Sequence, residues 1–301
     1  MRAARIHEIG SLPQVDELAP LETADALRVS MSALNPVDVA IGTGRFYGGV
    51  PPTPYVIGSE AVGLMPDGRR VWARGRQLMA ELVDPAAAEW VFDVPDGLSD
   101  EGALVCGTAG LTAWLAVSWR APVQPDDTVL VLGASGTLGS VAVQGAKLLG
   151  AGRVIGAARR TDLVPAAADE VFDLSGDGPL PEATYIVDGL WGEPFERAMA
   201  SAAVGVRVVH LGQSAGPAST LLSAWVRGKV ANIFGHSLFS LPEAAAATGY
   251  RRLAEHVRDG EISVEAEAYP LDAIADAWQR QASGSPGAKI VVALTKDINT
   301  R

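Results

Sequence analysis

The stretch VLVLGASGTLGS, Val129 to Ser140, decides how this chain folds. Its opening VLVL is an uninterrupted apolar run, typical of a strand that is buried on both faces. Three glycines, Gly133, Gly136 and Gly139, follow at once, and a helical apolar pattern runs on to Leu149. A glycine-rich turn between a strand and a helix presents free backbone N–H groups and the positive end of the helix dipole. The stretch therefore predicts a site for an anion.

The glycine spacing of this turn is typical of dinucleotide-binding proteins. Gly136 would let a phosphate approach the backbone closely, and Gly139 would let the helix lie close to the strand. Tight turns that bind nothing use similar spacing, but the surrounding pattern of strands and helices favours dinucleotide binding. The predicted cofactor contacts in this turn are Gly133, Ser135, Gly136, Thr137, Leu138 and Gly139.

Apolar strand candidates alternate with helical segments from Thr128 onward. The strands are expected in TVLVLG, RVIGAA, EVFDL, TYIVDGL and VRVVHLG. Unbroken apolar strands that alternate with helices indicate a parallel sheet covered on both faces. We therefore predict an α/β fold class, with a Rossmann-type doubly wound parallel sheet in residues 119–260.

The first third of the chain has a different pattern, because proline and glycine interrupt it too often for long helices. Short β-rich segments are expected there, such as PYVIGSEAVGLM and AEWVFDVPDGLS. The tail ISVEAEAYPLDAIADAWQRQASGSPGAKIVVAL supplies a strand, a helix and a final strand that could return to the first domain. The predicted division is one domain of residues 1–118 and 261–301, and a second of residues 119–260.

Composition argues against several classes of protein. The 301 residues have a net charge of −11, which disfavours binding to nucleic acid. The single cysteine, Cys106, cannot form a disulfide within the chain, which indicates a reducing compartment. No segment resembles a signal peptide or the run of about 20 apolar residues in a membrane-spanning helix. We therefore expect a cytoplasmic protein with no membrane partner.

Two arginines follow the second predicted strand of the Rossmann sheet, where an NAD site would place an acidic residue. Arg159 and Arg160 suit a ribose 2′-phosphate, because paired guanidinium groups give charge-assisted hydrogen bonds. NADPH is therefore predicted in preference to NADH. The alternative is two solvated arginines at a helix start. Asp162 is displaced from the acid position and is expected to cap the following turn.

The chain resembles the medium-chain dehydrogenase/reductase superfamily and, within it, the zinc-free quinone oxidoreductase group. The resemblance spans nearly the whole length and rests on the segments ALNPVDVAIGTGRF, PYVIGSEAVGLM, VPDGLSDEGAL, AGLTAW, GASGTLGSVAVQGAKLLGA, RVVHLG, YPLDAIADAW and PGAKIVV. It implies an N-terminal twisted β-barrel of the GroES-like type as the catalytic domain, completed by the C-terminal tail. It also implies a homodimer formed through the Rossmann sheets, by a segment such as KVANIFG.

The resemblance departs from the zinc-dependent alcohol dehydrogenases. Those relatives place a Gly-His-Glu triplet where this chain has Gly58, Ser59 and Glu60, and a cysteine ligand near the position of Asp38. Serine is a poor zinc ligand at neutral pH, and Cys106 falls in the wrong segment to replace the thiolate. We therefore predict no metal site, and expect Glu60 to make an internal hydrogen bond or ion pair.

Three residues are candidates for the catalytic site. Asn35 matches the asparagine that lines the cleft in the quinone oxidoreductase group; the alternative is a turn residue ahead of a proline. Asp38 matches the acid of that motif and could orient a ribose, a water or a side chain, or make only a structural hydrogen bond. Tyr47 could supply a phenolic proton or clamp a flat substrate, unless Phe46 takes its place and offers stacking alone.

Further cofactor contacts are predicted outside the glycine turn. Thr112 matches a position that faces the cofactor in relatives, although a buried threonine bonded to helix carbonyls is the alternative. Leu211, Gly212 and Gln213 follow a strand at its carboxyl end, where open sheets bind ligands, and could contact the nicotinamide carboxamide. Lys289 could approach the cofactor phosphates or be a solvated lysine.

Without a metal, hydride transfer requires an already electrophilic carbon positioned against the nicotinamide. Quinones and α,β-unsaturated carbonyls meet that requirement, so the leading hypothesis is an NADPH-dependent, zinc-independent quinone or enone reductase. One alternative is a metal-free ketone or alcohol oxidoreductase, or a specialised biosynthetic reductase. Another is a catalytically inactive NADPH-binding sensor or scaffold.

Overall fold

A computed structural model of the chain describes residues 1–284 and 286–295, which form two compact units. Unit 1 comprises Met1–Thr108, Tyr250–Arg258 and the described residues from Glu265 onward. Unit 2 comprises Ala109–Gly249 and Asp259–Val264. In the described ranges, no helix has the length and apolar character that crossing a bilayer requires.

The centre of unit 2 is a six-stranded sheet in which every neighbouring pair is parallel. The strands lie in the order β11 (Glu170–Asp173), β10 (Arg153–Ala158), β9 (Thr128–Leu132), β12 (Tyr185–Asp188), β13 (Arg207–His210) and β14 (Asn232–Gly235). The chain moves outward from β9 in one direction and then restarts on its other side at β12. This reversal is the doubly wound arrangement, which binds ligands at the carboxyl ends of its strands.

Helical segments precede, connect and follow these strands. They are α3 (Thr108–Leu115), the π-helical segment Ala116–Arg120, α4 (Thr137–Leu148), the 3-10 turn Thr161–Leu163, α5 (Gly192–Ser201), α6 (Ser223–Gly228), the 3-10 turn Leu238–Ser240 and α7 (Glu243–Arg258). The strands β9, β10 and β12 are almost entirely buried, as the unbroken apolar runs predict. The predicted Rossmann-type sheet is therefore confirmed.

Unit 1 is built from two mainly antiparallel sheets. The larger sheet has the order β15 (Ala266–Pro270), β16 (Lys289–Ala293), β3 (Leu27–Leu34), β5 (Glu60–Leu64), β6 (Arg70–Arg74) and β8 (Trp90–Asp93), with β7 (Leu82–Val83) also paired to β3. The smaller sheet has the order β2 (Gln14–Glu17), β1 (Arg2–Ile6) and β4 (Tyr55–Val56). One hydrophobic core includes residues of both sheets, such as Ile6 and Val29, so the sheets form one body.

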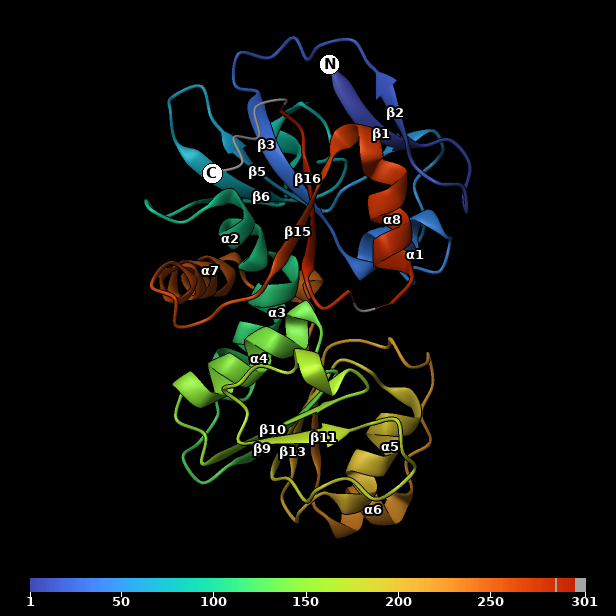
Figure 1. Cartoon of the computed structure of the whole chain (residues 1–301), viewed down its shortest axis with the longest axis vertical. Coiled ribbons are helices and arrows are strands. Elements are labelled where there is room, and N and C mark those ends of the chain that lie inside the picture. The colour runs from blue at the N-terminus through green and yellow to red at the C-terminus, as the bar shows by residue number, and fades with distance from the viewer. Residues whose placement is uncertain (285, 296–301) are drawn as a thin grey trace. The chain divides into compact units, whose positions relative to one another are not determined.

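The C-terminal tail completes this unit. The strand β16 pairs with β3 on one side and β15 on the other, and Figure 1 shows these three strands side by side. The helix α8 (Ile274–Ala282) packs on the same core through Ile274, Ala277 and Trp278. The remaining helical segments are α1 (Pro36–Gly42), α2 (Asp100–Val105) and the 3-10 turns Pro85–Ala87 and Leu271–Ala273. The predicted return of the tail to the first domain is confirmed.

The observed units differ from the predicted division at three places: residues 109–118 and 261–264 belong to unit 2, and residues 250–258 belong to unit 1. Residues 109–118 belong to unit 2, because Trp114 and Val117 pack against Gly145 of α4 and the Tyr185 hydroxyl donates to the Ala116 carbonyl at 2.8 Å. Residues 250–258 belong to unit 1, because the Tyr250 ring stacks on an aromatic side chain of β6 at 4.8 Å. Helical periodicity shows which residues of a helix are buried but not which body buries them.

Close packing of α4 on β9 depends on Gly139. A Cβ atom there would lie 2.2 Å from the Gly133 carbonyl oxygen and 2.7 Å from the Ala134 Cα, both of which are backbone atoms. We expect Gly139→Ala to lower the free energy of unfolding of unit 2 by about 1–3 kcal/mol, the usual cost of overpacking. Urea denaturation followed by circular dichroism would measure the loss.

The matched control for this prediction is Gly228→Ala, at the end of α6. A Cβ atom at Gly228 meets nothing within 4 Å, so this variant should be as stable as the natural chain. Equal stability of the two variants would contradict the role given to Gly139.

Candidate active site

The predicted anion site is the turn between β9 and α4. Gly133 has a φ of 82°, a conformation that glycine adopts without strain. The N–H groups of Gly133 and Ala134 donate to the Ala157 carbonyl, which fixes the turn against β10. Gly136 is the N-cap of α4, and no side chain in the described part of the protein caps this end. The first turn of a 12-residue helix therefore presents its N–H groups to an incoming anion.

Arg159 and Arg160 lie just beyond the carboxyl end of β10. This strand is the neighbour of β9, which leads into the glycine turn. Arg159 and Arg160 are both exposed, and within the residues that the structure describes neither guanidinium has a hydrogen-bond or ion-pair partner. By contrast, Arg153 at the opposite end of β10 is paired with Glu170. Asp162 lies inside the 3-10 turn and does not cap it, because the N-cap position belongs to Arg160. The expectation for Asp162 was therefore wrong.

A buried carboxylate organises the carboxyl ends of β12 and β13. Asp188 is 0% exposed and accepts from the backbone N–H groups of Leu190 and Trp191, each at 2.9 Å. Its other oxygen lies 2.8 Å from Nδ1 of His210, whose ring also contacts the Trp191 ring at 4.1 Å. The sequence analysis missed this pair, because only the parallel register places Asp188 opposite His210.

The residues predicted to contact the nicotinamide come directly after Asp188 and His210 at the carboxyl edge of the sheet. The Leu211 N–H donates to the Asp188 carbonyl at 2.8 Å, and Gly212 lies so near Gly189 that a Cβ atom would be 3.0 Å from its carbonyl oxygen. Gln213 is exposed just beyond them, at the carboxyl edge where open sheets bind ligands. Thr112 is buried in α3. Cofactor contacts by these residues stay predictions.

Unit 1 contains a second polar centre, built around Glu60. This carboxylate is 0% exposed; one oxygen accepts from Lys289 Nζ at 2.6 Å and from Asn35 Nδ2 at 2.8 Å. Its other oxygen accepts from Trp72 Nε1 at 2.9 Å and from the Thr108 N–H at 2.7 Å. These donors hold the pKa of Glu60 below its usual value in spite of burial, with the Lys289 ammonium contributing most. The expected internal ion pair of Glu60 is confirmed.

This centre corrects two expectations. Lys289 is 2% exposed and its ammonium bonds to Glu60 and to Asn35 Oδ1 at 2.7 Å, so it is neither solvated nor directed at a phosphate. Asn35 donates its amide hydrogens to Glu60 and to Ser59 Oγ, at 2.8 and 3.2 Å. Because both ends of this amide have partners inside the protein, Asn35 has no donor left for a substrate. Its structural role was the alternative in the sequence analysis.

Asp38 lies at the border between this centre and a pocket. One of its oxygens accepts from the Asn35 N–H at 2.8 Å and from Ser59 Oγ at 3.0 Å, so α1 begins with a carboxylate-capped turn. Asp38 is 4% exposed, and burial raises the pKa of its carboxyl group to about 7. Near neutral pH both protonation states of this group are therefore populated.

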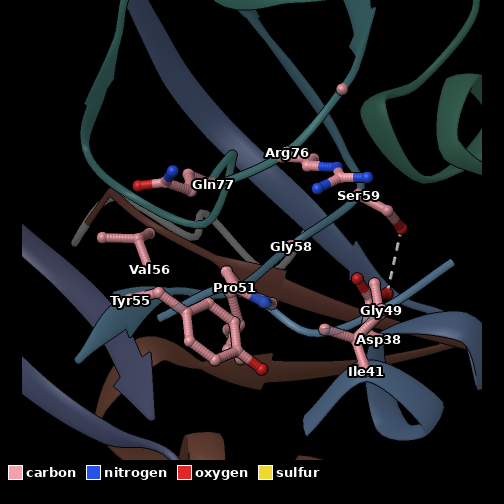
Figure 2. Close-up of a pocket in the computed structure, with 12 residues that line it drawn as sticks. Asp38, Ile41, Gly49, Pro51, Tyr55, Val56, Gly58, Ser59, Arg76 and Gln77 are labelled. Carbon is pink, nitrogen blue, oxygen red and sulfur yellow. Dashed lines mark hydrogen bonds between the residues drawn. The ribbon is translucent and has the colours of Figure 1, made fainter. Parts of the chain in front are cut away.

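Figure 2 shows the pocket that Asp38 borders. The hydrogen bond between Asp38 and Ser59 lies on one side, and the Tyr55 ring reaches across from β4 with its oxygen toward the side of Ile41 and Asp38. The cavity has a volume of about 50 Å³. The exposed guanidinium of Arg76 is on the rim beside Ser59. All of these residues belong to unit 1.

Tyr47 is placed away from this pocket's lining. It is 79% exposed on the loop that follows α1, where its ring packs against Phe46 at 4.7 Å. A catalytic role for Tyr47 stays a prediction. The sequence analysis missed Tyr55, because PYVIGSE has the pattern of an ordinary buried strand.

The donor set at the positions that hold zinc in relatives does not fit a metal. The Ser59 hydroxyl donates a hydrogen bond to Asp38, and the two oxygens of Glu60 accept hydrogen bonds from four donors. Among the described residues, no three His, Cys, Asp or Glu side chains come together with the spacing of a metal site. Burial also raises the pKa of the Cys106 thiol, which disfavours the thiolate that zinc binds.

The raised pKa of Asp38 makes a pH-dependent contribution to stability. In the unfolded chain the pKa of this carboxyl group is about 3.9, so between that pH and about 7 the folded state binds more protons than the unfolded state. Stability contributed by Asp38 therefore falls as pH rises through this window, by at most about 1.4 kcal/mol per pH unit. Because Asp38→Asn stays neutral, its stability relative to the natural chain should increase from pH 4 to pH 7, as measured by urea denaturation.

Three neighbours of Asp38 affect this prediction. The Ser59 hydroxyl and the Lys289 ammonium favour the charged form, and Glu60 opposes it. Glu60 itself contributes stability that is lost as pH falls below its unfolded pKa of about 4.3, outside the Asp38 window. The control Asp96→Asn, at an exposed site, should follow the natural pH profile. An Asp38→Asn profile parallel to the natural one would contradict the prediction.

Comparison with known proteins gives relatives of several kinds, although no protein-family model matches the chain. A phenolphthiocerol/phthiocerol polyketide synthase of Mycobacterium tuberculosis is 28% identical over 97% of this chain, which spans only 14% of that protein. A human quinone oxidoreductase is 28% identical over 58% of both chains. An acryloyl-coenzyme A reductase of Metallosphaera sedula is 33% identical over 40% of this chain and 37% of its own.

A solved structure extends the likeness over the full fold. The quinone oxidoreductase of Thermus thermophilus, also solved in complex with NADPH, matches 98% of this chain and 100% of its own with a TM-score of 0.81 and 26% identity. The likeness includes both units, the parallel sheet and the β-rich unit with its returning tail. In sequence and in fold the chain is therefore similar to quinone oxidoreductases of the medium-chain dehydrogenase/reductase superfamily.

Proposed function

We propose that this protein is an NADPH-dependent oxidoreductase that reduces a quinone or an α,β-unsaturated carbonyl compound without a metal. The observation that carries the proposal is the pair of unpartnered arginines beside the uncapped helix end in unit 2. Acidic partners are plentiful in a protein of net charge −11, yet neither of these adjacent guanidinium groups has one among the described residues. A bound phosphate explains why both remain free.

The cofactor's parts correspond to separate features of unit 2. The N–H groups at the start of α4 would hold the pyrophosphate, and Arg159 and Arg160 would hold the 2′-phosphate. The segment Leu211 to Gln213 would contact the nicotinamide carboxamide. When bound, NADPH supplies a hydride to an electrophilic carbon. The complex of the Thermus thermophilus relative with NADPH supports this assignment.

The substrate class follows from the donor set in unit 1. Ser59, Asp38 and Glu60 are bonded to each other or to protein donors, so the site offers hydrogen bonds and a proton but no Lewis acid ligands. A conjugated carbonyl is already electrophilic and delocalises incoming charge onto its oxygen. The names of the human quinone oxidoreductase and the acryloyl-coenzyme A reductase are consistent with such substrates.

Assembly and location complete the proposal. The strand β14 is the edge of the parallel sheet, and its residues are mostly exposed, which supports a homodimer formed by this edge. The cytoplasmic location stays a prediction from composition.

The cofactor assignment predicts a selective loss of NADPH affinity. Replacing both arginines, Arg159→Ala with Arg160→Ala, should weaken NADPH binding by about tenfold or more, because charge-assisted hydrogen bonds to the 2′-phosphate are lost. NADH binding should change far less. Titration calorimetry with each cofactor measures both. The matched control is Arg153→Ala on the same strand, which should leave NADPH affinity unchanged; equal losses for the two cofactors would refute the assignment.

The reaction assignment is tested by turnover with a panel of acceptors. NADPH oxidation should be fast with 1,4-benzoquinone or an acyclic enone and slow with acetone, and treatment with EDTA should not change the rate. A preference for acetone would favour the ketone reductase alternative. NADPH binding without oxidation by any acceptor would favour the inactive binding protein.

A further inference from the structure

The pocket of Figure 2 contains a hydrogen-bond donor that has no acceptor among the described residues. Tyr55 is 7% exposed, and its hydroxyl is buried without a hydrogen-bond partner in the described part of the chain. A buried hydroxyl left unpaired costs about 1–3 kcal/mol, so natural proteins rarely retain one without a use. The other fully buried tyrosines are satisfied: the Tyr185 hydroxyl donates to Ala116 and that of Tyr250 to Ala103. Tyr55 therefore points to a ligand.

The pocket offers a second polar group on the same side. Asp38 directs one oxygen to Asn35 and Ser59, whereas no described residue donates to the other. The Ser59 hydroxyl donates its hydrogen to Asp38, so it has no hydrogen left to donate to a ligand. Burial and the Asp38 charge raise the pKa of Tyr55 to about 12, which keeps its hydroxyl protonated. Because the pKa of Asp38 is raised to about 7, its carboxyl group is partly protonated at neutral pH.

The walls and size of the pocket limit what it can accept. Ile41, Pro51, Val56 and Ile57 give it an apolar lining. A cavity of about 150 Å³ holds a benzene ring, and a single water needs only about 10–15 Å³. The observed volume of about 50 Å³ is therefore too small for a quinone ring but sufficient for a carbonyl group and the carbon beside it.

We infer that this pocket is a binding subsite for the carbonyl end of an acyclic α,β-unsaturated compound, with the Tyr55 hydroxyl donating to the carbonyl oxygen beside the Asp38 carboxyl group. Two donors that converge on one oxygen stabilise negative charge that develops there. The catalytic role of this subsite rests on the proposed function. The subsite narrows the expected substrates of that function to acyclic enones or thioesters in preference to quinones. Binding itself needs no cofactor, so it can be measured separately.

The direct test observes the five tyrosines one by one. The protein is labelled with 3-fluorotyrosine, and the fluorine resonances of residues 47, 55, 185, 250 and 269 are assigned with single Tyr→Phe variants. Crotonamide is titrated without NADPH. The Tyr55 resonance should shift and saturate, whereas that of Tyr185 in unit 2 should stay in place. n-Butylamine and cyclohex-2-enone should not reproduce the shift.

Paired variants separate binding from stability. Because its hydroxyl has no partner among the described residues, Tyr55→Phe should leave the melting temperature unchanged and weaken crotonamide binding roughly threefold to tenfold, the effect of one neutral hydrogen bond. Tyr185→Phe, which loses a bond at 2.8 Å, should lower the melting temperature and keep crotonamide affinity.

Three results would overturn the inference. The Tyr55 resonance could stay unmoved with crotonamide, n-butylamine could bind there instead, or Tyr55→Phe could destabilise the protein as Tyr185→Phe does. Failure of the proposed function has a different signature, namely loss of NADPH binding or turnover with the crotonamide shift intact.

Discussion

The buried carboxylate of Glu60 is the constraint on which unit 1 depends. It brings together β5, β16, β6 and the starts of α1 and α3, because its partners Lys289, Trp72, Asn35 and Thr108 come from those elements. Removing one partner of a buried ion pair leaves an uncompensated charge, at a cost of about 3–5 kcal/mol. Lys289 is 229 residues away in sequence from Glu60. The return of the C-terminal tail is therefore required by charge as well as by strand pairing.

The same constraint determines which side chains remain available for chemistry. Asn35 and Lys289 are committed to Glu60, and Gly107 must be glycine because a Cβ atom there would lie 1.9 Å from a Glu60 oxygen. Asp38 is joined to this centre by the hydrogen bond from the Asn35 N–H. One oxygen of Asp38 caps α1, and the other borders the pocket. Rigid support on one side and a small cavity on the other is the arrangement that holds a functional group in one orientation.

The features that could be predicted from the sequence are those that depend on residues close together along the chain. The glycine turn, the apolar parallel strands and the unusual Arg159 and Arg160 each occupy a few consecutive residues, so periodicity and turn chemistry identify them. The features that it missed join distant segments. Asp188 meets His210 only through parallel register, and Lys289 meets Glu60 only through the fold of the tail. Tyr55 has the pattern of a core residue, and only the structure shows that its hydroxyl has no partner in the described part of the chain.

Two charged clusters, one in each unit, differ in burial in a way that suits the proposed cofactor and substrate. Arg159 and Arg160 of unit 2 are exposed and have no partner among the described residues, which suits the phosphates of a charged cofactor. Glu60 and Lys289 of unit 1 are buried and neutralise each other, which suits a neutral carbonyl compound nearby. Where zinc-dependent relatives place metal ligands, Ser59 and Asp38 form a hydroxyl–carboxyl pair that holds a proton. In the proposed reaction, Tyr55 and Asp38 would stabilise a developing oxyanion as hydrogen-bond donors in a largely buried pocket, where each hydrogen bond is stronger than in water.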